Sequence, residues 1–357
     1  MKNAISLFSG MGGDSLGLKL AGYNIIAYSE IEKHFRVSHD LNFPDSKILG
    51  ESVNSNIQKI SDDELLEYKN KVDLIFAGFP CQGFSQAGKK LPSDPRNTLF
   101  REFLRATRLI NPKYIIGENV KGLLSRKTDT GDNFIDIIVK EFENLGYAIK
   151  YKVMKANLHG IPQNRHRLII VGIRKDIKKD YTFPDEDTET KLDLKNIVKF
   201  NMTGCLKIDN EDFDFNDIPK ECILKDMKNS EDENDNYKPH PNLVTLAKKR
   251  DYVYKGVAYP NRLTFGKRIP VGGEIIDIRK PLNTIICTYA RQPRFFVPQK
   301  NINGNFLRCL LPDELKQIQG FPADYKINGD TGKQIVQIGN AVPPPLIKQV
   351  VENLEDA

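Results

Sequence analysis

Residues 4–30, AISLFSGMGGDSLGLKLAGYNIIAYSE, decide the fold, because they contain two apolar runs joined by a glycine-rich turn and a helical segment. The runs at 4–8 and 25–29 predict buried strands, and residues 14–22 between them predict a helix. A strand, a helix and a strand in this order, with strands that are apolar throughout, are typical of a parallel sheet covered by helices on both faces. The stretch therefore predicts an α/β fold.

The same alternation continues to about residue 175. Apolar runs predict further strands at 72–77, 114–117 and 168–173, and helices are expected at 100–110 and 134–145. In an open parallel sheet the ligand site lies beyond the carboxyl ends of the strands. The residues that fall at such ends, and are therefore expected at the site, are Gly10, Glu30, Cys81 and Glu118.

The composition is that of a globular protein that needs no disulfide bond to fold. The chain has 357 residues and five cysteines, and no two cysteines form a CxxC pair. A chain of this length buries enough surface to fold without a disulfide or a metal, and the cysteine usage predicts a reducing compartment. No apolar run reaches the ~18 residues of a membrane span, and the N-terminus lacks a signal-peptide pattern. We expect a soluble intracellular protein without a metal site.

The net charge of +6 conceals an uneven distribution along the chain. Residues 176–236 contain 18 acidic and 9 basic residues, whereas residues 237–308 contain 14 basic and only 3 acidic residues. A basic block interleaved with Tyr and Phe suits a polyanion, since each neutralised phosphate releases counterions. On composition alone, a solvated basic face is an equally good interpretation.

A second domain is expected after about residue 180, where the alternation of strands and helices stops. Residues 181–240 are acidic and irregular, and residues 252–297 alternate short β-like pieces with Gly and Pro. Helical patterns return after residue 311. We therefore expect a catalytic and cofactor-binding domain at 1–180, completed by about 325–357, and a smaller β-rich domain at 181–324.

Several residues near the predicted strand ends can carry chemistry. The turn 9–13 lets the backbone approach a ligand, and Glu30 is placed to accept hydrogen bonds from ribose hydroxyls. Since the dinucleotide pattern G-x-G-x-x-G is absent, the turn fits a cofactor without a pyrophosphate, such as S-adenosylmethionine. Cys81 has nearby lysines that would favour its thiolate, although a lone cysteine is more often a small core residue. Taken singly, three other residues favour capping or surface roles: Glu118, Arg165 and Arg167.

The combination of short motifs is more specific than any one of them. In chain order the sequence contains FSGMGG, Glu30, GFPCQGFS, PRNTLF, ENV, QNRHR, QGFP and GNAVPPP. Together they resemble the C5-cytosine DNA methyltransferases, in the order and at the spacings of that family. The resemblance covers nearly the whole chain except about residues 181–270, where the family has its variable target-recognition domain. It implies a Rossmann-like, S-adenosylmethionine-dependent methyltransferase fold, and the compact chain is similar to the bacterial restriction–modification type.

The resemblance implies methyl transfer from S-adenosylmethionine to C5 of a cytosine flipped out of duplex DNA, with S-adenosylhomocysteine as the product. Cys81 of the PCQ motif would attack C6, because C5 becomes nucleophilic only after that addition. Glu118 of ENV would hydrogen-bond N3 and the exocyclic amine. Arg165 and Arg167 would face the O2 side of the base and help to hold Glu118. A water is a candidate for the base that removes the C5 proton.

The resemblance also implies a cofactor pocket. Phe8 would pack on the adenine, three glycines would line the methionine side, and Glu30 would bind the ribose. The complete implied set is Phe8, Gly10, Gly12, Gly13, Glu30, Asn56, Pro80, Leu99, Asn340 and Val342. Two positions depart from the family pattern, because Ser6 replaces an aspartate and Asn56 replaces the aspartate that contacts the adenine amine. We expect altered cofactor affinity from these changes rather than loss of activity.

DNA contacts are expected in two regions. The loop 82–96 is a candidate lid over the flipped base, with an ordinary polar loop as the alternative. Its polar residues are Gln82, Ser85, Lys89, Lys90 and Arg96. The basic block 237–308 would approach the major groove, and its candidate contacts are Arg262, Lys267, Arg268, Arg291 and Arg294. Arg279 resembles the family's element that closes the recognition region and is expected to act by its position.

Three other functions are weighed against this one. A tRNA cytosine methyltransferase is an alternative because one branch of the family modifies tRNA, and a catalytically silent DNA-binding relative is another. A Rossmann oxidoreductase is disfavoured, because G-x-G-x-x-G is absent and the PCQ loop would be unexplained. The expected partner is double-stranded DNA, and a separately acting restriction endonuclease is a second candidate. We expect a monomer in the bacterial cytoplasm, associated with the nucleoid.

Overall fold

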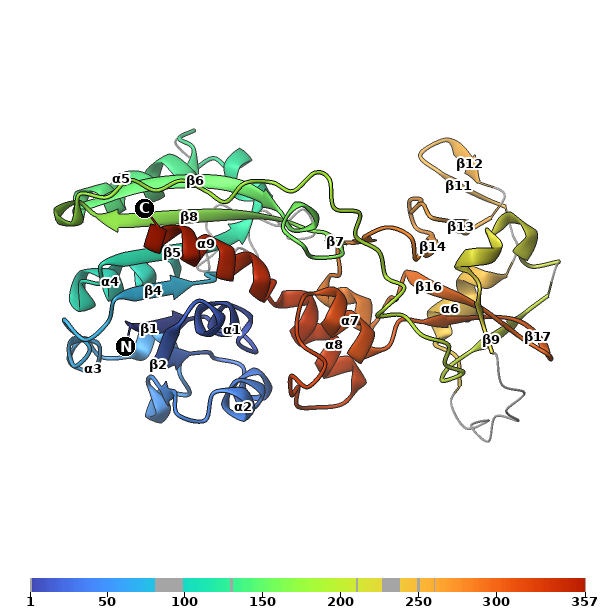
Figure 1. Ribbon diagram of the computed structural model, residues 1–357, viewed down its shortest axis with the longest axis horizontal. Coiled ribbons are helices and arrows are strands. Elements are labelled where there is room, and N and C mark those ends of the chain that lie inside the picture. Colours follow the sequence, from blue (N-terminus) through green and yellow to red (C-terminus); the bar gives the residue numbers. More distant parts are fainter. Residues whose placement is uncertain are drawn as a thin grey trace. The chain divides into compact units, whose positions relative to one another are not determined.

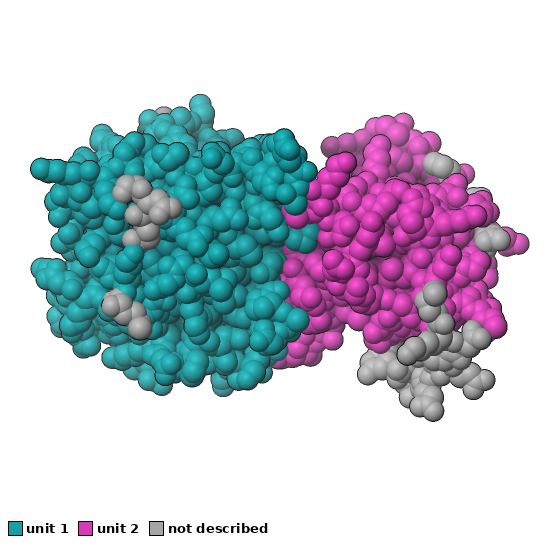
Figure 2. All heavy atoms as spheres, in the orientation of Figure 1, with its two compact units in different colours: residues 1–190, 319–328, 340–357 teal, residues 191–318, 329–339 magenta. Residues whose placement is uncertain are grey.

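The computed structural model describes residues 2–80, 99–128, 131–209, 211–226, 238–248, 251–259 and 261–356. The chain divides into two compact units (Figure 2). Unit 1 contains residues 1–190, 319–328 and 340–357, and unit 2 contains residues 191–318 and 329–339. Unit 1 is therefore completed by two segments from the C-terminal end of the chain.

Unit 1 is built on a seven-stranded sheet in the order β3-β2-β1-β4-β5-β8-β6 (Figure 1). Its strands are β1 (Lys2–Leu7), β2 (Tyr23–Ser29), β3 (Lys47–Ile48), β4 (Leu74–Ala77), β5 (Tyr114–Val120), β6 (Tyr147–Lys155) and β8 (His166–Arg174). The strands from β3 to β5 pair in parallel. The mostly parallel sheet expected from the sequence is thereby confirmed.

β8 is antiparallel to both of its neighbours, β5 and β6. Counting the strand at 168–173 among parallel strands was therefore wrong. An apolar run indicates only that a strand is covered on both faces, and β8 is buried from Leu168 to Ile173. The short connection from β6 to β8 suffices because antiparallel strands need no long crossover. β6 gave no apolar signal, because this edge strand exposes several of its residues.

Helices cover both faces of this sheet (Figure 1). They are α1 (Gly13–Leu20), α2 (Lys33–Asn42), α3 (Asp62–Leu66), α4 (Leu99–Ile110), α5 (Phe134–Asn144) and α9 (Pro344–Asp356). On one face, Ile5 and Leu7 of β1 belong to the same core cluster as Phe103 of α4 and Phe142 of α5. Successive side chains of a strand point to opposite faces, so Ser6 points to the other face, where it bonds to a residue of α1.

The C-terminal helix α9 packs against α1 in unit 1. A Cβ placed on Gly17 of α1 would lie 2.7 Å from the Ile347 side chain and 2.7 Å from the Pro344 carbonyl oxygen. The absence of a side chain at Gly17 thus allows the two helices to approach closely. This packing brings the last residues of the chain to the unit formed mainly by residues before 190.

Unit 2 is rich in short strands. Its main sheet has the path β13-β14-β16-β17-β9, with β10 paired to β16, and a separate hairpin joins β11 to β12. These strands are β9 (Leu206–Ile208), β10 (Leu224–Lys225), β11 (Tyr252–Tyr254), β12 (Val257–Tyr259), β13 (Leu263–Phe265), β14 (Gly273–Ile275), β16 (Phe295–Asn301) and β17 (Gly304–Cys309). The helices are α6 (Pro241–Ala247), α7 (Pro312–Ile318) and α8 (Thr331–Asn340), of which Asn340 belongs to unit 1. Two-residue strands β7 (Gln163–Asn164) and β15 (Leu282–Asn283) lie in units 1 and 2 respectively.

A buried ion pair fixes the sheet of unit 2 to α7. Arg308 is fully buried, and its Nη2 lies 2.7 Å from Glu314 Oε1. Arg308 also donates to Gln299 Oε1 at 3.2 Å and to the Lys199 carbonyl at 2.6 Å. A buried charge is tolerated when it is paired and hydrogen-bonded in this way. Across the residues described in both units, no helix has the length and apolarity needed to cross a membrane.

Candidate active site

The loop between β1 and α1 has a backbone that a glycine-rich sequence adopts most easily. Phe8, Gly10 and Gly12 have φ values of 58°, 57° and 92°, in the left-handed region that favours glycine. The Gly10 amide donates to Glu30 Oε2 at 2.9 Å, which ties the loop to the end of β2. The carboxyl ends of β1 and β2 are thus joined by a direct hydrogen bond.

Two of the loop glycines are required by the protein's own packing, and one is not. A Cβ at Gly13 would lie 2.3 Å from the Val342 carbonyl oxygen, and a Cβ at Gly12 would lie 2.7 Å from the Phe43 ring. A Cβ at Gly10 would meet no atom within 4 Å among those described. Gly10 therefore borders open space in which a ligand can approach the backbone.

Glu30 is a carboxylate at the end of β2 with only 8% of its surface exposed. Its two oxygens accept hydrogen bonds from the amides of Gly10 and Glu32, at 2.9 and 2.8 Å. Burial raises the pKa of Glu30, and the two amide hydrogen bonds oppose that shift. Each oxygen has a further lone pair, so Glu30 can still accept hydrogen bonds from ribose hydroxyls.

The other residues of the expected cofactor pocket also lie in unit 1. Phe8 packs partly against the core, and the Val342 carbonyl lies beside Gly13. The side-chain oxygen of Asn56 accepts the Gln58 amide at 3.1 Å and caps a short 3₁₀ helix, so an adenine amine would have to share that oxygen. The remaining members stand after β4, at the start of α4 and at the end of α8, and are Pro80, Leu99 and Asn340.

An ion pair occupies the carboxyl end of β5. Arg167 Nε lies 2.6 Å from Glu118 Oε1, and the two side chains are 14% and 16% exposed. Burial lowers the pKa of Arg167, and the neighbouring Glu118 charge opposes that shift. The apolar run predicts a strand that ends at residue 117, but pairing with β8 extends it to Val120. Glu118 therefore lies within the strand rather than after it.

The ends of β1, β4 and β5 meet at Glu118. A Cβ placed on Gly78, which follows β4, would lie 3.7 Å from Glu118 Oε2 and 3.7 Å from the Phe8 carbonyl oxygen. Asn119 Nδ2 donates to the Phe79 carbonyl at 3.2 Å and so holds the backbone that leads to the PCQ motif. The predicted nucleophile and lid residues lie outside the described residues; they are Cys81, Gln82, Ser85, Lys89, Lys90 and Arg96.

Arg165 contacts the backbone of the GNAVPPP segment. It is fully buried, and its Nη2 donates to the Ala341 carbonyl at 2.9 Å. The same carbonyl accepts a hydrogen bond from Gln319 Nε2 at 2.5 Å, and Gln319 Oε1 accepts one from Gln163 Nε2 at 2.6 Å. This network joins the QNRHR, QGFP and GNAVPPP motifs. The sequence does not predict a role for the two glutamines, because a contact between residues 156 positions apart leaves no local pattern.

The family model for C-5 cytosine-specific DNA methylases matches residues 2–356. The chain belongs to this family. It is 33% identical over 361 residues to the type II methyltransferase M1.HphI of Haemophilus parahaemolyticus, with 98% of this chain and 85% of that protein covered. It is 29% identical over 357 residues to the type II methyltransferase M.BsuFI of Bacillus subtilis, with 99% of this chain and 72% of that protein covered.

A solved structure of a DNMT2 mutant from Spodoptera frugiperda has the same fold as this methylase. The TM-score is 0.67 at 18% sequence identity, and the match covers 99% of this chain and 100% of that chain. The family model and the match to M1.HphI confirm the family resemblance found in the sequence and the activity of a DNA cytosine-C5 methyltransferase. The roles of individual residues stay predictions.

The basic residues of the block 237–308 that are expected to contact DNA in this methylase lie in unit 2 and differ in their surroundings. Lys267, Arg268 and Arg291 are exposed, whereas Arg262 is half-buried and lies 4.9 Å from the centre of the Tyr252 ring. Arg268 and Arg294 line one small depression, and burial together with the Arg268 charge lowers the pKa of Arg294. These five side chains form none of the ion pairs found in the described part of unit 2.

Arg279 of the same unit is held by two carboxylates. Its Nε lies 2.9 Å from Asp277 Oδ1, and its Nη1 lies 2.6 Å from Glu221 Oε1. The hydrogen bonds from Arg279 lower the pKa of Asp277. These contacts suit a positioning residue better than a phosphate contact, since the positive charge is already balanced.

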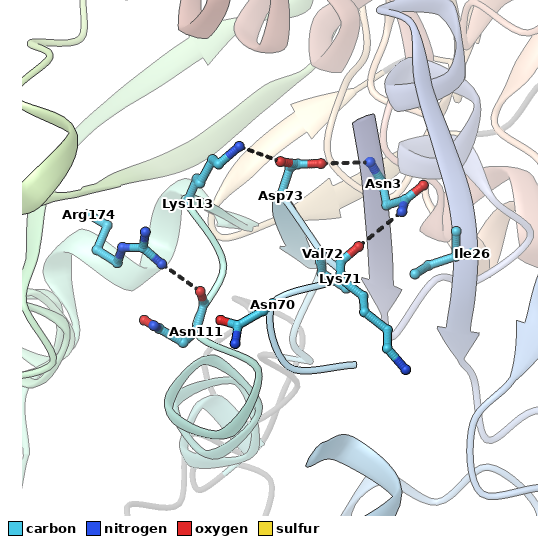
Figure 3. A pocket seen from close by; sticks show the side chains of 9 residues that line it. All are labelled: Asn3, Ile26, Asn70, Lys71, Val72, Asp73, Asn111, Lys113 and Arg174. Atoms are coloured by element: carbon cyan, nitrogen blue, oxygen red, sulfur yellow. Dashed lines mark hydrogen bonds and ion pairs between the residues drawn. The ribbon is translucent and has the colours of Figure 1, made fainter. Parts of the chain in front are cut away.

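A pocket of about 650 Å³ lies in unit 1 near the opposite ends of the strands (Figure 3). Its polar groups bind one another, because Lys113 Nζ lies 2.8 Å from Asp73 Oδ1 and the Asn3 amide donates to Asp73 Oδ2 at 2.9 Å. No residue predicted for the active site lines it, so we assign it no part in the chemistry. In the segments that the structure describes, no three His, Cys, Asp or Glu side chains are grouped so as to hold a metal ion.

Proposed function

We propose that this methylase transfers a methyl group from S-adenosylmethionine to C5 of a cytosine flipped out of a specific duplex DNA sequence, through a covalent bond between Cys81 and C6. The observation that supports this most directly is the Glu118–Arg167 pair beside the ends of β1 and β4. Because Arg167 contacts Oε1 of Glu118, Oε2 is the atom that we assign to N3 of the base. Cys81 follows three residues after Gly78, the residue beside Oε2.

The residues around Gly10 fit S-adenosylmethionine. Open space borders Gly10, and Glu30 retains lone pairs for the ribose hydroxyls. When bound, this cofactor supplies an electrophilic methyl group and leaves as S-adenosylhomocysteine. We assign its binding to Phe8, Gly10, Gly12, Gly13, Glu30, Asn56, Pro80, Leu99, Asn340 and Val342.

In the proposed reaction, the Cys81 thiolate forms a bond to C6, and the electron pair of the C5–C6 double bond is delocalised over C5, C4 and N3. Glu118 hydrogen-bonds N3 and the exocyclic amine and holds a proton at N3 as negative charge develops there. C5 then forms its bond to the methyl group. A base, with water as the candidate, removes the C5 proton; the C5–C6 double bond re-forms, and Cys81 leaves as the thiolate.

The two arginines receive different roles in this proposal. Arg167 orients Glu118 and balances its charge through the 2.6 Å contact. Arg165 secures the QNRHR segment to the Ala341 carbonyl and so to the stretch that carries Val342. Both arginines are also assigned to the O2 side of the base.

We assign duplex DNA binding to the basic block 237–308 of unit 2. The exposed residues Lys267, Arg268 and Arg291 can reach phosphates or base edges, and Arg262 and Arg294 belong to the same block. Because the two relatives described above are named type II methyltransferases, we further propose that methylation protects DNA from a separate restriction endonuclease.

The covalent step is tested with duplex DNA that carries 5-fluorocytosine in the target sequence. Fluorine at C5 prevents the elimination, so the wild-type protein is expected to form a stable adduct with the DNA in the presence of cofactor. Cys81→Ser is expected to form none, and Cys287→Ser, in unit 2, is the matched control that should form it normally. An adduct that persists in Cys81→Ser would refute the nucleophile assignment.

The substrate is tested by bisulfite sequencing of DNA that was incubated with the purified protein and S-adenosylmethionine. We expect one short recognition sequence with a single methylated cytosine. A parallel reaction with total tRNA distinguishes a DNA substrate from a tRNA substrate. Methylation of tRNA without methylation of DNA would contradict the proposal. Binding of DNA without methylation of either would support a catalytically silent relative.

A further inference from the structure

We propose that Ser6 and Asp14 form a buried clamp that closes the base of the loop 8–13 and so positions this loop for the methyl donor. The inference rests on the proposed function, since it concerns the loop to which we assign the cofactor. Ser6 and Asp14 are positioning residues, because they act through the loop rather than on the reacting atoms.

The clamp joins the two elements that carry the loop. Ser6 lies on β1, two residues before Phe8, and Asp14 is the second residue of α1. The Ser6 hydroxyl donates to Asp14 Oδ2, and the two residues are 0% and 2% exposed. A hydrogen bond between residues on either side of a loop fixes the separation of the loop's two ends.

The loop needs this constraint because its backbone is held in unfavourable conformations. Phe8, which is not a glycine, has a φ of 58°. Such conformations persist only where the surrounding structure determines them. The amides of Gly10 and Ser9 anchor the loop to Glu30 and to the Ser29 carbonyl at the end of β2. The Tyr325 hydroxyl donates to the Met11 carbonyl, and the Ser6–Asp14 bond adds an anchor to α1.

The buried carboxyl group of Asp14 lowers the stability of the folded protein, so packing alone does not explain its presence at this position. The Glu118 charge raises the pKa of Asp14, and the Asp14 charge raises the pKa of Tyr325. Among the described residues, no cation pairs with Asp14. Burial raises its pKa to about 7, although Ser6 and the amides of Asp14 and Ser15 oppose that shift by hydrogen bonding. A carboxylate in the first turn of a helix is favoured by the helix dipole, but a buried carboxylate without a cation is still unfavourable at neutral pH.

The sequence suggests why the carboxylate is present. The motif resemblance placed an aspartate at position 6, and this chain has Ser6 there. The structure has a carboxylate in contact with that position, and it comes from α1 through Asp14 instead of from β1. A carboxylate is therefore present at this place in the structure, on the helix instead of on the strand.

The test is a reciprocal exchange in the full-length protein. Ser6→Ala and Asp14→Ala each remove one partner, and the double variant Ser6→Asp with Asp14→Ser restores both groups on opposite elements. Binding of S-adenosylmethionine is measured by calorimetry, and KM and kcat are measured with duplex DNA. We expect each single change to weaken binding about tenfold or more, with a much smaller loss of kcat at saturating cofactor. The exchanged double variant is expected to regain most of the affinity.

Ser38→Ala is the matched control for loss of a buried hydroxyl. Ser38 is fully buried, and its hydroxyl contacts the His34 carbonyl and the Asn328 amide rather than the loop. The proposal is overturned if Ser6→Ala binds the cofactor as tightly as Ser38→Ala does, or if the exchanged variant binds no better than the single variants. Ser6→Ala decides the matter if Asp14→Ala does not fold. Failure of the wild-type protein to bind S-adenosylmethionine would instead refute the proposed function.

Discussion

Glu118 is held by Arg167 through Oε1, and we assign the other oxygen to the base. Glu118→Gln keeps the shape of the side chain but removes the group that can hold a proton at N3. We expect kcat to fall by roughly 10²- to 10⁴-fold, the usual contribution of a positioned acid or base. Cofactor affinity should stay within a few-fold of the wild-type value, because the cofactor residues lie mainly on other loops. Single-turnover kinetics and a cofactor titration measure both quantities, and an equal loss of both would indicate a structural role.

Asp14 predicts a pH dependence of stability. Its pKa is about 7 in the folded protein, against 3.8 for an exposed aspartate. Between these values the folded protein binds a proton that the unfolded chain has released, so this residue destabilises the fold progressively as the pH rises toward 7. Asp14→Asn removes the effect and keeps an acceptor for Ser6.

We therefore expect Asp14→Asn to be more stable than the wild-type protein at about pH 8, by ~4 kcal/mol as an upper limit. The advantage should shrink as the pH falls toward about 5. Thermal unfolding of both proteins across this range measures the difference, and other titrating groups cancel because the two proteins share them. A difference that does not change with pH would contradict the assignment.

At the scale of the element, the glycine-rich loop predicts opposite behaviour for two similar substitutions. Gly13→Ala places a Cβ 2.3 Å from the Val342 carbonyl oxygen, so the C-terminal segment must shift and the protein should lose roughly 1–3 kcal/mol of stability. Gly10→Ala meets no described atom within 4 Å, but its methyl group enters the space assigned to the cofactor. It should lose only about 1–2 kcal/mol, for the left-handed backbone, and bind the cofactor much more weakly. Thermal unfolding and calorimetry separate the two effects, and normal cofactor binding by Gly10→Ala would place the ligand elsewhere.

The same elements mark what the sequence can and cannot predict. The glycine-rich turn, the helices α4 and α5 and the strands β1, β2 and β4 are local patterns, and the structure confirms them. The direction of β8 is not local, because a strand covered on both faces has the same apolar run in either direction. The Ser6–Asp14 and Gln163–Gln319 contacts were also out of reach, because each depends on which residues folding brings together.

At the scale of the whole molecule, residues that are far apart along the chain belong to the same compact unit. Unit 1 combines three segments of the chain, and the hydrogen bonds to Ala341 join residues from all three. The family motifs are therefore spread over the full length although their described members, apart from Gly339, lie in one unit. It follows that substitutions near the C-terminus, at Gln319 for example, bear on the same site as substitutions in the first 170 residues.

The uneven charge of the chain leads to a prediction about DNA binding by the whole protein. Each phosphate that a lysine or arginine neutralises contributes about −0.9 to the slope of log K against log salt. Arg268 and Arg291 are exposed and form no ion pair with the described residues, so Arg268→Glu and Arg291→Glu should each reduce the steepness by about 1 or more. Arg279→Glu makes the same charge change in the same unit, but Arg279 is already balanced by Asp277 and Glu221.

Arg279→Glu should therefore lower the melting temperature, because without Arg279 the carboxylates of Asp277 and Glu221 repel each other. The salt dependence of DNA binding should stay nearly unchanged, because we expect no phosphate contact from Arg279. Fluorescence anisotropy with a labelled duplex, at salt concentrations from about 50 to about 300 mM, gives the slopes for the wild-type protein and the three variants. Equal slopes for all three variants would show that DNA responds only to net charge. A reduced slope for Arg268→Glu and Arg291→Glu alone would assign the contact to the unpaired arginines of unit 2, which composition by itself could not distinguish from the paired one.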